Sequence, residues 1–134
     1  MGIVLMELIK KHRIEYAHFQ YIVPPIKRCK YIVTVHDVLF IDFPEYFPFF
    51  YRIKNTFLYR FSINISDIIL TVSEYSKEKI QTHFGIKNVL ITTNAVDEAF
   101  FESYDKQAIK EKINTEFGLS DYLIYVSRWE PRKN

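Results

Sequence analysis

The chain has 134 residues, of which 49 % are hydrophobic, so it can bury a core as one domain and is not disordered. Its 18 Lys and Arg residues nearly balance 16 Asp and Glu residues, which argues against nucleic acid as a bulk partner. The single cysteine, Cys29, excludes an internal disulfide and a multi-cysteine zinc site and fits a reducing cytoplasm. The sequence holds no glycine-rich phosphate loop and no apolar run long enough to cross a membrane.

The first third of the chain predicts a helix, two strands and a loop. Apolar positions followed by cations predict a helix over residues 3–12, and a short strand is expected at 14–19. Pro24 and Pro25 then force a loop. Residues 31–35 form a β-branched and nearly continuous apolar run, which predicts a strand buried on both faces.

An aromatic stretch runs from Phe40 to Phe61 and includes a loop with two prolines at residues 42–48. Phe49, Ile53, Phe57 and Phe61 recur every four residues and predict a helix. Because basic residues lie among these aromatic side chains, one interpretation places the stretch at a membrane surface. We favour the other interpretation, in which the helix faces the core.

The remaining elements continue the alternation of strand and helix. They are a strand at 68–72, a helix capped by Ser73 and ended by Gly85, a strand at 88–92, a charged helix at 105–117 and a buried strand at 121–127. Such alternation predicts an α/β fold, with a Rossmann-like parallel sheet and flanking helices. The polar stretch 94–120 is the best candidate boundary between two domains.

His36 and Asp37 directly follow the strand at 31–35. Ligands bind at the carboxyl ends of strands in open parallel sheets, so His36 is a candidate for contact or proton exchange with a substrate. The alternative is a histidine whose ring nitrogens are satisfied by the backbone or by Asp37. For Asp37 itself, we favour capping of the next turn or orientation of His36 over direct chemistry.

Three cations, Arg128, Arg132 and Lys133, follow the last predicted strand. Arg and Lys at such a place can bind a diphosphate and neutralise it as a leaving group. The alternative is a solvated loop in which Glu130 pairs with Arg132. Ser73 is in the first place a helix cap, but the free amides of that helix end could also face an anion.

The other histidines do not predict a metal site. His12 and His83 lie near predicted helix ends, and His18 lies in a predicted strand. None has a second ligand at metal spacing, and the sequence has no D-x-D motif for a metal-bound diphosphate. We therefore expect no metal ion and no other cofactor besides a substrate.

Several segments, taken together and in order, resemble the group 1 glycosyltransferases, also called family four, of the GT-B fold. The ordered set covers nearly the whole chain. The segments are His18-Phe19-Gln20 with Pro24-Pro25, Val33-Thr34-Val35-His36-Asp37, residues 67–77, Asn94-Ala95-Val96-Asp97-Glu98 and residues 126–134.

The resemblance implies two Rossmann-like domains that face a cleft, with the acceptor on the N-terminal domain and a nucleotide-sugar donor on the C-terminal domain. It implies transfer with retention of configuration and without a metal ion. By motif position, His36 is the expected catalytic residue beside the transferred sugar, and Arg128 and Lys133 are expected to hold the donor diphosphate. Asp37 and Ser73 are further candidates for substrate binding.

The chain departs from the family pattern at both ends, because it opens in a later helix and lacks the glycine-rich loop and the paired-glutamate motif. We expect residues 1–98 to be the C-terminal part of the acceptor-binding domain and 99–120 to be a linker and helix. Residues 121–134 are then the first strand and phosphate-contacting loop of a truncated donor-binding domain. Such a fragment should show no turnover alone.

The expected partners are a nucleotide-sugar donor and a glycan or lipid-linked acceptor, in polysaccharide biosynthesis in the cytoplasm or at the inner face of the membrane. Two alternatives stay open. One is a fragment of a GT-B nucleotide-sugar epimerase. The other is a non-catalytic truncated product or interaction module, which would self-associate or pair with a separately encoded C-terminal half.

Overall fold

The computed structural model describes residues 2–130 and 133. The chain divides into two compact units, Met1–Asn94 and Ala95–Asn134, and each is described separately. The division falls at the start of the polar stretch 94–120.

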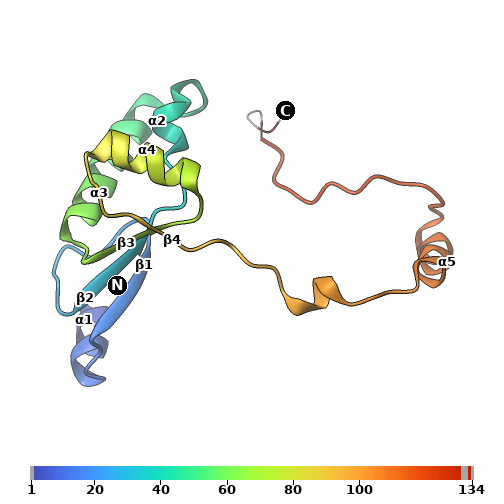
Figure 1. The fold of residues 1–134 in the computed structure, drawn as a ribbon, viewed down its shortest axis with the longest axis horizontal. Helices are drawn as coiled ribbons and strands as arrows, with labels where there is room; N and C mark the ends of the chain where they lie inside the picture. The colour runs from blue at the N-terminus through green and yellow to red at the C-terminus, as the bar shows by residue number, and fades with distance from the viewer. Residues whose placement is uncertain (1, 131–132, 134) are drawn as a thin grey trace. The chain divides into compact units, whose positions relative to one another are not determined.

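The first unit is an α/β unit built on a four-stranded sheet (Figure 1). All three strand pairings are parallel, and the strands lie in sequence order across the sheet. The strands are β1 (Tyr16–Gln20), β2 (Lys30–Thr34), β3 (Ile68–Thr71) and β4 (Leu90–Ile91). The helices are α1 (Gly2–Lys11), α2 (Leu39–Asp42), the 3-10 helix η1 (Pro44–Tyr46), α3 (Phe49–Ile65) and α4 (Glu74–Phe84). This arrangement confirms the predicted Rossmann-like fold class.

The core is centred on β2, as the apolar run at 31–35 predicts. The side chains of Tyr31, Val33 and Val35 are fully buried, and Ile63 of α3 and Ile80 of α4 belong to the same core. Strands β1 and β3 flank β2, with Phe19 and Ile69 in register on either side of Val33. A strand with a neighbour on each side and a core-forming face supplies much of the apolar burial that stabilises the unit.

Helix α4 begins and ends as predicted. The Ser73 side chain accepts a hydrogen bond from the backbone N–H of Ser76, which satisfies one free amide of the first turn. Gly85 has φ 70°, the left-handed conformation that glycine adopts without steric cost. The strand expected at 88–92 is shorter than predicted, since only Leu90–Ile91 pairs with β3.

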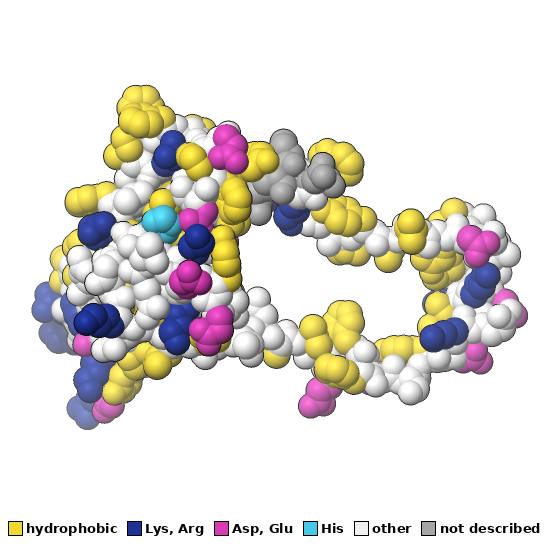
Figure 2. Space-filling model, turned by 45° about the horizontal axis from the view of Figure 1, so that its top comes forward, with side chains coloured by type: hydrophobic (Ala, Val, Ile, Leu, Met, Phe, Trp, Pro, Cys, Tyr) yellow, Lys and Arg dark blue, Asp and Glu magenta, His cyan; other side chains and the backbone are white. Residues whose placement is uncertain are grey.

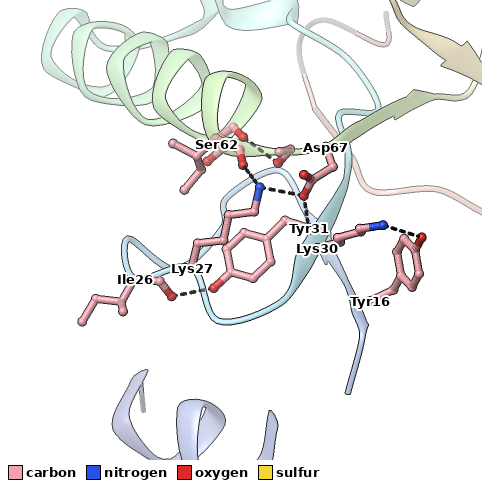
Figure 3. Close-up of polar contacts among 9 residues, drawn as sticks. Tyr16, Ile26, Lys27, Lys30, Tyr31, Ser62 and Asp67 are labelled. Carbon is pink, nitrogen blue, oxygen red and sulfur yellow. Dashed lines mark hydrogen bonds and ion pairs between the residues drawn. The ribbon is translucent and has the colours of Figure 1, made fainter. Parts of the chain in front are cut away.

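Asp67 directly precedes β3 and contacts both the start of β2, at Tyr31, and the loop between β1 and β2, at Lys27 (Figure 3). Its Oδ2 atom lies 2.7 Å from the backbone nitrogen of Tyr31 and 2.7 Å from Nζ of Lys27. The hydrogen bond from Lys27, and then that from the Tyr31 N–H, hold the pKa of Asp67 below its ordinary value. Lys27 also donates to the carbonyl of Ile65 at the end of α3.

Cys29 lies in the same loop and is half-buried against the core. Burial of the thiol raises its pKa above the ordinary value.

Helix α3 faces the core, as the favoured interpretation expects, but it does so through a face other than the aromatic stripe. The buried residues of this helix are Asn55, Tyr59, Ser62 and Ile63. The stripe that starts at Phe49 lies on the opposite side, and most of its members are exposed. The helix carries apolar side chains on more than one face, and only one face can pack on the sheet.

The second unit contains the 3-10 helix η2 (Glu98–Phe101) and helix α5 (Lys106–Phe117). Helix α5 is capped by Asp105 and followed by Gly118 with φ 68°, in agreement with the helix expected at 105–117. The buried strand expected at 121–127 is wrong, because the segment is irregular and Leu123 and Val126 are 102 % and 88 % exposed. A strand needs hydrogen-bonded neighbours, and the described residues of this unit include no strand that could pair with it.

No helix within the described residues is both long and apolar enough to span a membrane.

Candidate functional site

The carboxyl ends of β1 and β2 bring a glutamine and a histidine together in the first unit. Gln20 is the last residue of β1 and pairs in register with Thr34 of β2. His36 lies two residues beyond Thr34, and its Nε2 atom is 2.5 Å from Oε1 of Gln20. Because an amide oxygen can only accept, this contact is a hydrogen bond in the tautomer of His36 that carries the proton on Nε2. The predicted alternative partner, Asp37, does not make this bond.

The ring of Tyr21 contacts the rings of His36 and Tyr59. The Tyr21 and His36 centroids are 5.2 Å apart with the rings tilted by 45°, and Tyr21 stacks on Tyr59 of α3 at 5.4 Å. Tyr21 has φ 62°, an uncommon backbone conformation for a residue with a side chain, and its N–H donates to the carbonyl of Thr34. The turn after β1 therefore directs an aromatic ring to the end of β2.

The phenols of Tyr21 and Tyr59 are held in the neutral form. Burial, and then the negative charge of Asp37, raise the pKa of Tyr21 to about 12. Burial also raises the pKa of Tyr59, with smaller effects from Tyr21, Tyr51 and Asp37. The two phenol hydroxyls therefore stay protonated to a higher pH than that of an ordinary tyrosine.

Asp37 begins the turn into α2. Its Oδ1 atom accepts a hydrogen bond from the backbone N–H of Leu39, with 3.3 Å between oxygen and nitrogen. This is the capping role that the sequence favours for Asp37. Ser73 likewise uses its hydroxyl locally, since Oγ accepts from the Ser76 N–H and donates to the Ser76 hydroxyl. Neither contact tests the further expectation of substrate binding.

The described cations of the terminal motif, Arg128 and Lys133, belong to the second unit. The Arg128 side chain is 83 % exposed, and its Nη1 atom lies 3.6 Å from Oε1 of Glu130. Lys133 turns back along the chain: its N–H donates to the Glu130 carbonyl and its Nζ donates to Oγ of Ser127, the neighbour of Arg128. The predicted alternative pairing of Glu130 with Arg132 lies outside the described residues.

Within the part of the chain that the structure describes, no three His, Cys, Asp or Glu side chains are grouped to hold a metal ion. His18 and His83 have structural partners instead. His18 Nε2 lies 2.7 Å from Oγ1 of Thr34, and His83 Nε2 lies 2.7 Å from Oδ1 of Asp42.

Reasoning from sequence assigned no role to three residues around His36, namely Gln20, Tyr21 and Tyr59. A signal for Gln20 was present, because parallel strands end at the same edge of a sheet, so the last residue of β1 had to lie near the residues after β2. Tyr59 is 23 residues beyond His36 in the sequence. Its position depends on how α3 packs, which no local pattern encodes.

The first unit thus has a parallel α/β sheet with polar side chains at the carboxyl ends of neighbouring strands, as in Rossmann-like ligand-binding domains. The family model described as Glycosyltransferase Family 4 matches residues 2–100. The match covers most of the chain, so the chain belongs to this glycosyltransferase family of the GT-B fold, as the sequence motifs predict. No curated protein matches the chain.

Proposed function

We propose that the chain takes part in the transfer of a sugar from a nucleoside-diphosphate donor to a hydroxyl group of an acceptor, with retention of configuration. The observation that carries this proposal is the family match over residues 2–100, which includes His36 at the carboxyl end of β2. The acceptor is a glycan or a lipid-linked glycan. The setting is polysaccharide biosynthesis on the cytoplasmic side of a membrane, with peripheral contact to the lipid.

His36 contacts the transferred sugar in this proposal. Its Nε2–H donates to Gln20 and its ring packs beside that of Tyr21, so the imidazole is held in one orientation. Nδ1 is then available to a sugar hydroxyl. A ring fixed before the substrate arrives costs less conformational entropy on binding than a free one.

Arg128 and Lys133 bind the diphosphate of the donor. Departure of the nucleoside diphosphate concentrates negative charge on its oxygens, and the two cations offset that charge without a metal ion. An exposed ion pair such as Arg128 with Glu130 contributes about 0–1 kcal/mol, so the guanidinium can exchange it for a diphosphate at little cost. Asp37 and Ser73 supply further polar contacts to the substrates.

In the proposed organisation, residues 1–98 belong to the acceptor-binding domain. Residues 99–120 form the linker and helix, and residues 121–134 belong to the donor-binding domain. The division of the structure between Asn94 and Ala95 lies close to the first of these boundaries.

Donor binding tests the proposal directly. Isothermal titration of the purified chain with nucleoside-diphosphate sugars should show binding that an Arg128→Ala, Lys133→Ala double variant weakens by about tenfold or more, since each charge-assisted bond contributes roughly 1.5–3 kcal/mol. The control is Lys112→Ala, which removes an exposed cation from α5. Absence of binding, or equal weakening by the control, would refute the proposed role of the terminal cations.

A further inference from the structure

Helix α3 turns an apolar face to the outside of the first unit. Its exposed side chains include Phe49, Phe50, Ile53 and Phe57, which are 63 %, 83 %, 54 % and 70 % exposed. The side that packs on the sheet carries Tyr59 and Ile63 and lies on the other side of the helix. We call the four exposed residues the outer face of α3. Large apolar side chains gathered in one exposed patch mark an interaction surface more often than scattered ones do.

The charged side chains of α3 itself have one sign, while Asp42 of α2 and the exposed Glu45 of η1 precede the helix. Residues 46–66 contain three cations, Arg52, Lys54 and Arg60, and no Asp or Glu. Lys54 and Arg60 are exposed. Arg60 is directed along the surface, since it donates to the carbonyl of His83 at 3.3 Å and lies over the ring of Phe84. Figure 2 shows the side chains by type on one side of the molecule, where Lys and Arg lie among hydrophobic side chains and Asp and Glu are also present.

A groove runs beside the outer face. It has a volume of about 340 Å³ and is lined by apolar residues of α2 and α3 together with Arg52, Thr56 and Arg60. Phe49, Ile53 and Phe57 belong to both the groove and the outer face. The same surface therefore offers apolar side chains and positive charge within one helix length.

We infer that the outer face of α3 docks on a membrane surface that contains anionic phospholipids. An interfacial helix lies in the plane of the bilayer, with Phe and other apolar side chains at the acyl boundary and Lys and Arg at the headgroup phosphates. The 17 residues of α3 supply both kinds of group. This inference rests on the proposed function and specifies its partner, because the transferase would then meet a lipid-linked acceptor where that acceptor is embedded.

Charge complementarity favours lipid over a second copy of the chain. Two copies that met through this face would bring six cations together without a nearby carboxylate in either helix, and like charges oppose such contact. An anionic headgroup instead satisfies the same cations.

Vesicle flotation of the whole chain tests the inference. Vesicles of phosphatidylcholine with about one-third phosphatidylglycerol should bind the chain, and pure phosphatidylcholine vesicles or high salt should reduce binding about threefold or more. The double variant Phe50→Ser, Phe57→Ser should also reduce binding about threefold or more, because it removes the apolar anchor. Both side chains are largely exposed, so circular dichroism of the variant should match that of the wild-type chain.

The matched control is Phe100→Ser, Phe101→Ser, which removes two phenylalanines of similar exposure, 78 % and 77 %, from η2. This control should bind vesicles as the wild-type chain does. The inference is overturned if the wild-type chain does not bind, if neutral vesicles bind it equally, or if the control loses as much binding. It is also overturned if sedimentation shows a dimer that only the α3 variant abolishes, without vesicle binding. Donor titration is independent of lipid, so failure here is distinct from failure of the proposed function.

Discussion

The Nε2 atom of His36 lies 2.5 Å from Oε1 of Gln20, although 16 residues separate the two in the sequence. The contact exists because β1 and β2 are parallel and in register, so both strands end at the same edge of the sheet. The orientation of the candidate catalytic imidazole is thus set by the neighbouring strand rather than by Asp37 beside it.

Replacement of Gln20 by Leu should release the His36 ring. In the wild-type chain the Nε2–H tautomer of His36 should dominate, and in Gln20→Leu the proportion of that tautomer should fall because the acceptor is gone. Long-range proton–nitrogen NMR spectra measure both tautomers. Gln20 is exposed, so its replacement should change the free energy of unfolding by only about 0.5 kcal/mol. Gln107→Leu, which removes a comparable exposed glutamine from α5, should leave His36 unchanged.

The raised pKa of Tyr21 predicts a loss of stability in alkali. A phenol whose pKa is raised in the folded state stabilises the fold fully below its ordinary pKa of 10, and this contribution is lost as the pH rises towards about 12. The phenylalanine in Tyr21→Phe cannot ionise. The midpoint temperature of thermal unfolding should therefore fall less steeply between these pH values in this variant than in the wild-type chain. Equal slopes would show that Tyr21 ionises as freely in the folded state as in the unfolded one. Tyr104→Phe, at an exposed position in the second unit, is the control.

Asp67 predicts a loss of stability in acid. Because its pKa is below the ordinary 3.8 in the folded state, its contribution is present above that value and is lost as the pH falls through the lowered one. Asp67→Asn removes the charge from a partly exposed ion pair with Lys27 and should cost about 0–1 kcal/mol at neutral pH. Chemical denaturation at neutral and at acidic pH should show this cost disappearing in acid.

Asp67→Ala should cost more, about 1–3 kcal/mol, because the N–H of the fully buried Tyr31 then loses its acceptor. If the Ala and Asn variants were equally stable, the hydrogen bond to Tyr31 would contribute nothing beyond the ion pair. Asp121→Asn is the control, at an exposed carboxylate that pairs with Lys110. It should leave the free energy of unfolding unchanged at both neutral and acidic pH.

The cap of α4 can be separated from substrate binding at Ser73. Ser73→Ala should cost about 1 kcal/mol in the free energy of unfolding, since the Ser76 N–H loses its acceptor, and Ser73→Asp should restore most of it. If Ser73 also binds substrate as proposed, the Asp variant should regain stability but not donor or acceptor affinity. Ser103→Ala, at an exposed serine, should leave stability unchanged. Equal stability of all variants would contradict the capping role.

The first unit could be predicted well because its signals are local. The β-branched run at 31–35 indicated a central strand, and Ser73 and Gly85 marked both ends of α4. The position of His36 followed from the end of its strand. Its partners did not follow, because Tyr59 reaches the site only through the packing of α3, and Tyr21 only through a turn with positive φ.

Two apolar patterns in the sequence are not buried in the structure, for one physical reason. The run at 121–127 has the composition of a buried strand, and the stripe that begins at Phe49 has the spacing of a buried helix face. Composition and spacing say which side chains can be buried, whereas burial itself requires a surface to pack against. In the structure the sheet meets the Tyr59 side of α3, and no described strand of the second unit pairs with residues 121–127.

The half-buried Cys29 makes the loop between β1 and β2 accessible to a kinetic experiment. The chain has no other cysteine, and only the thiolate reacts with alkylating reagents, so burial and the raised pKa should make modification slow at neutral pH. Reaction should then follow local opening of that loop, which begins at Tyr21, directly after Gln20. The rate of thiol labelling, measured by mass spectrometry, would report how often the segment beside His36 opens. A bound ligand that stabilises this segment should lower the labelling rate.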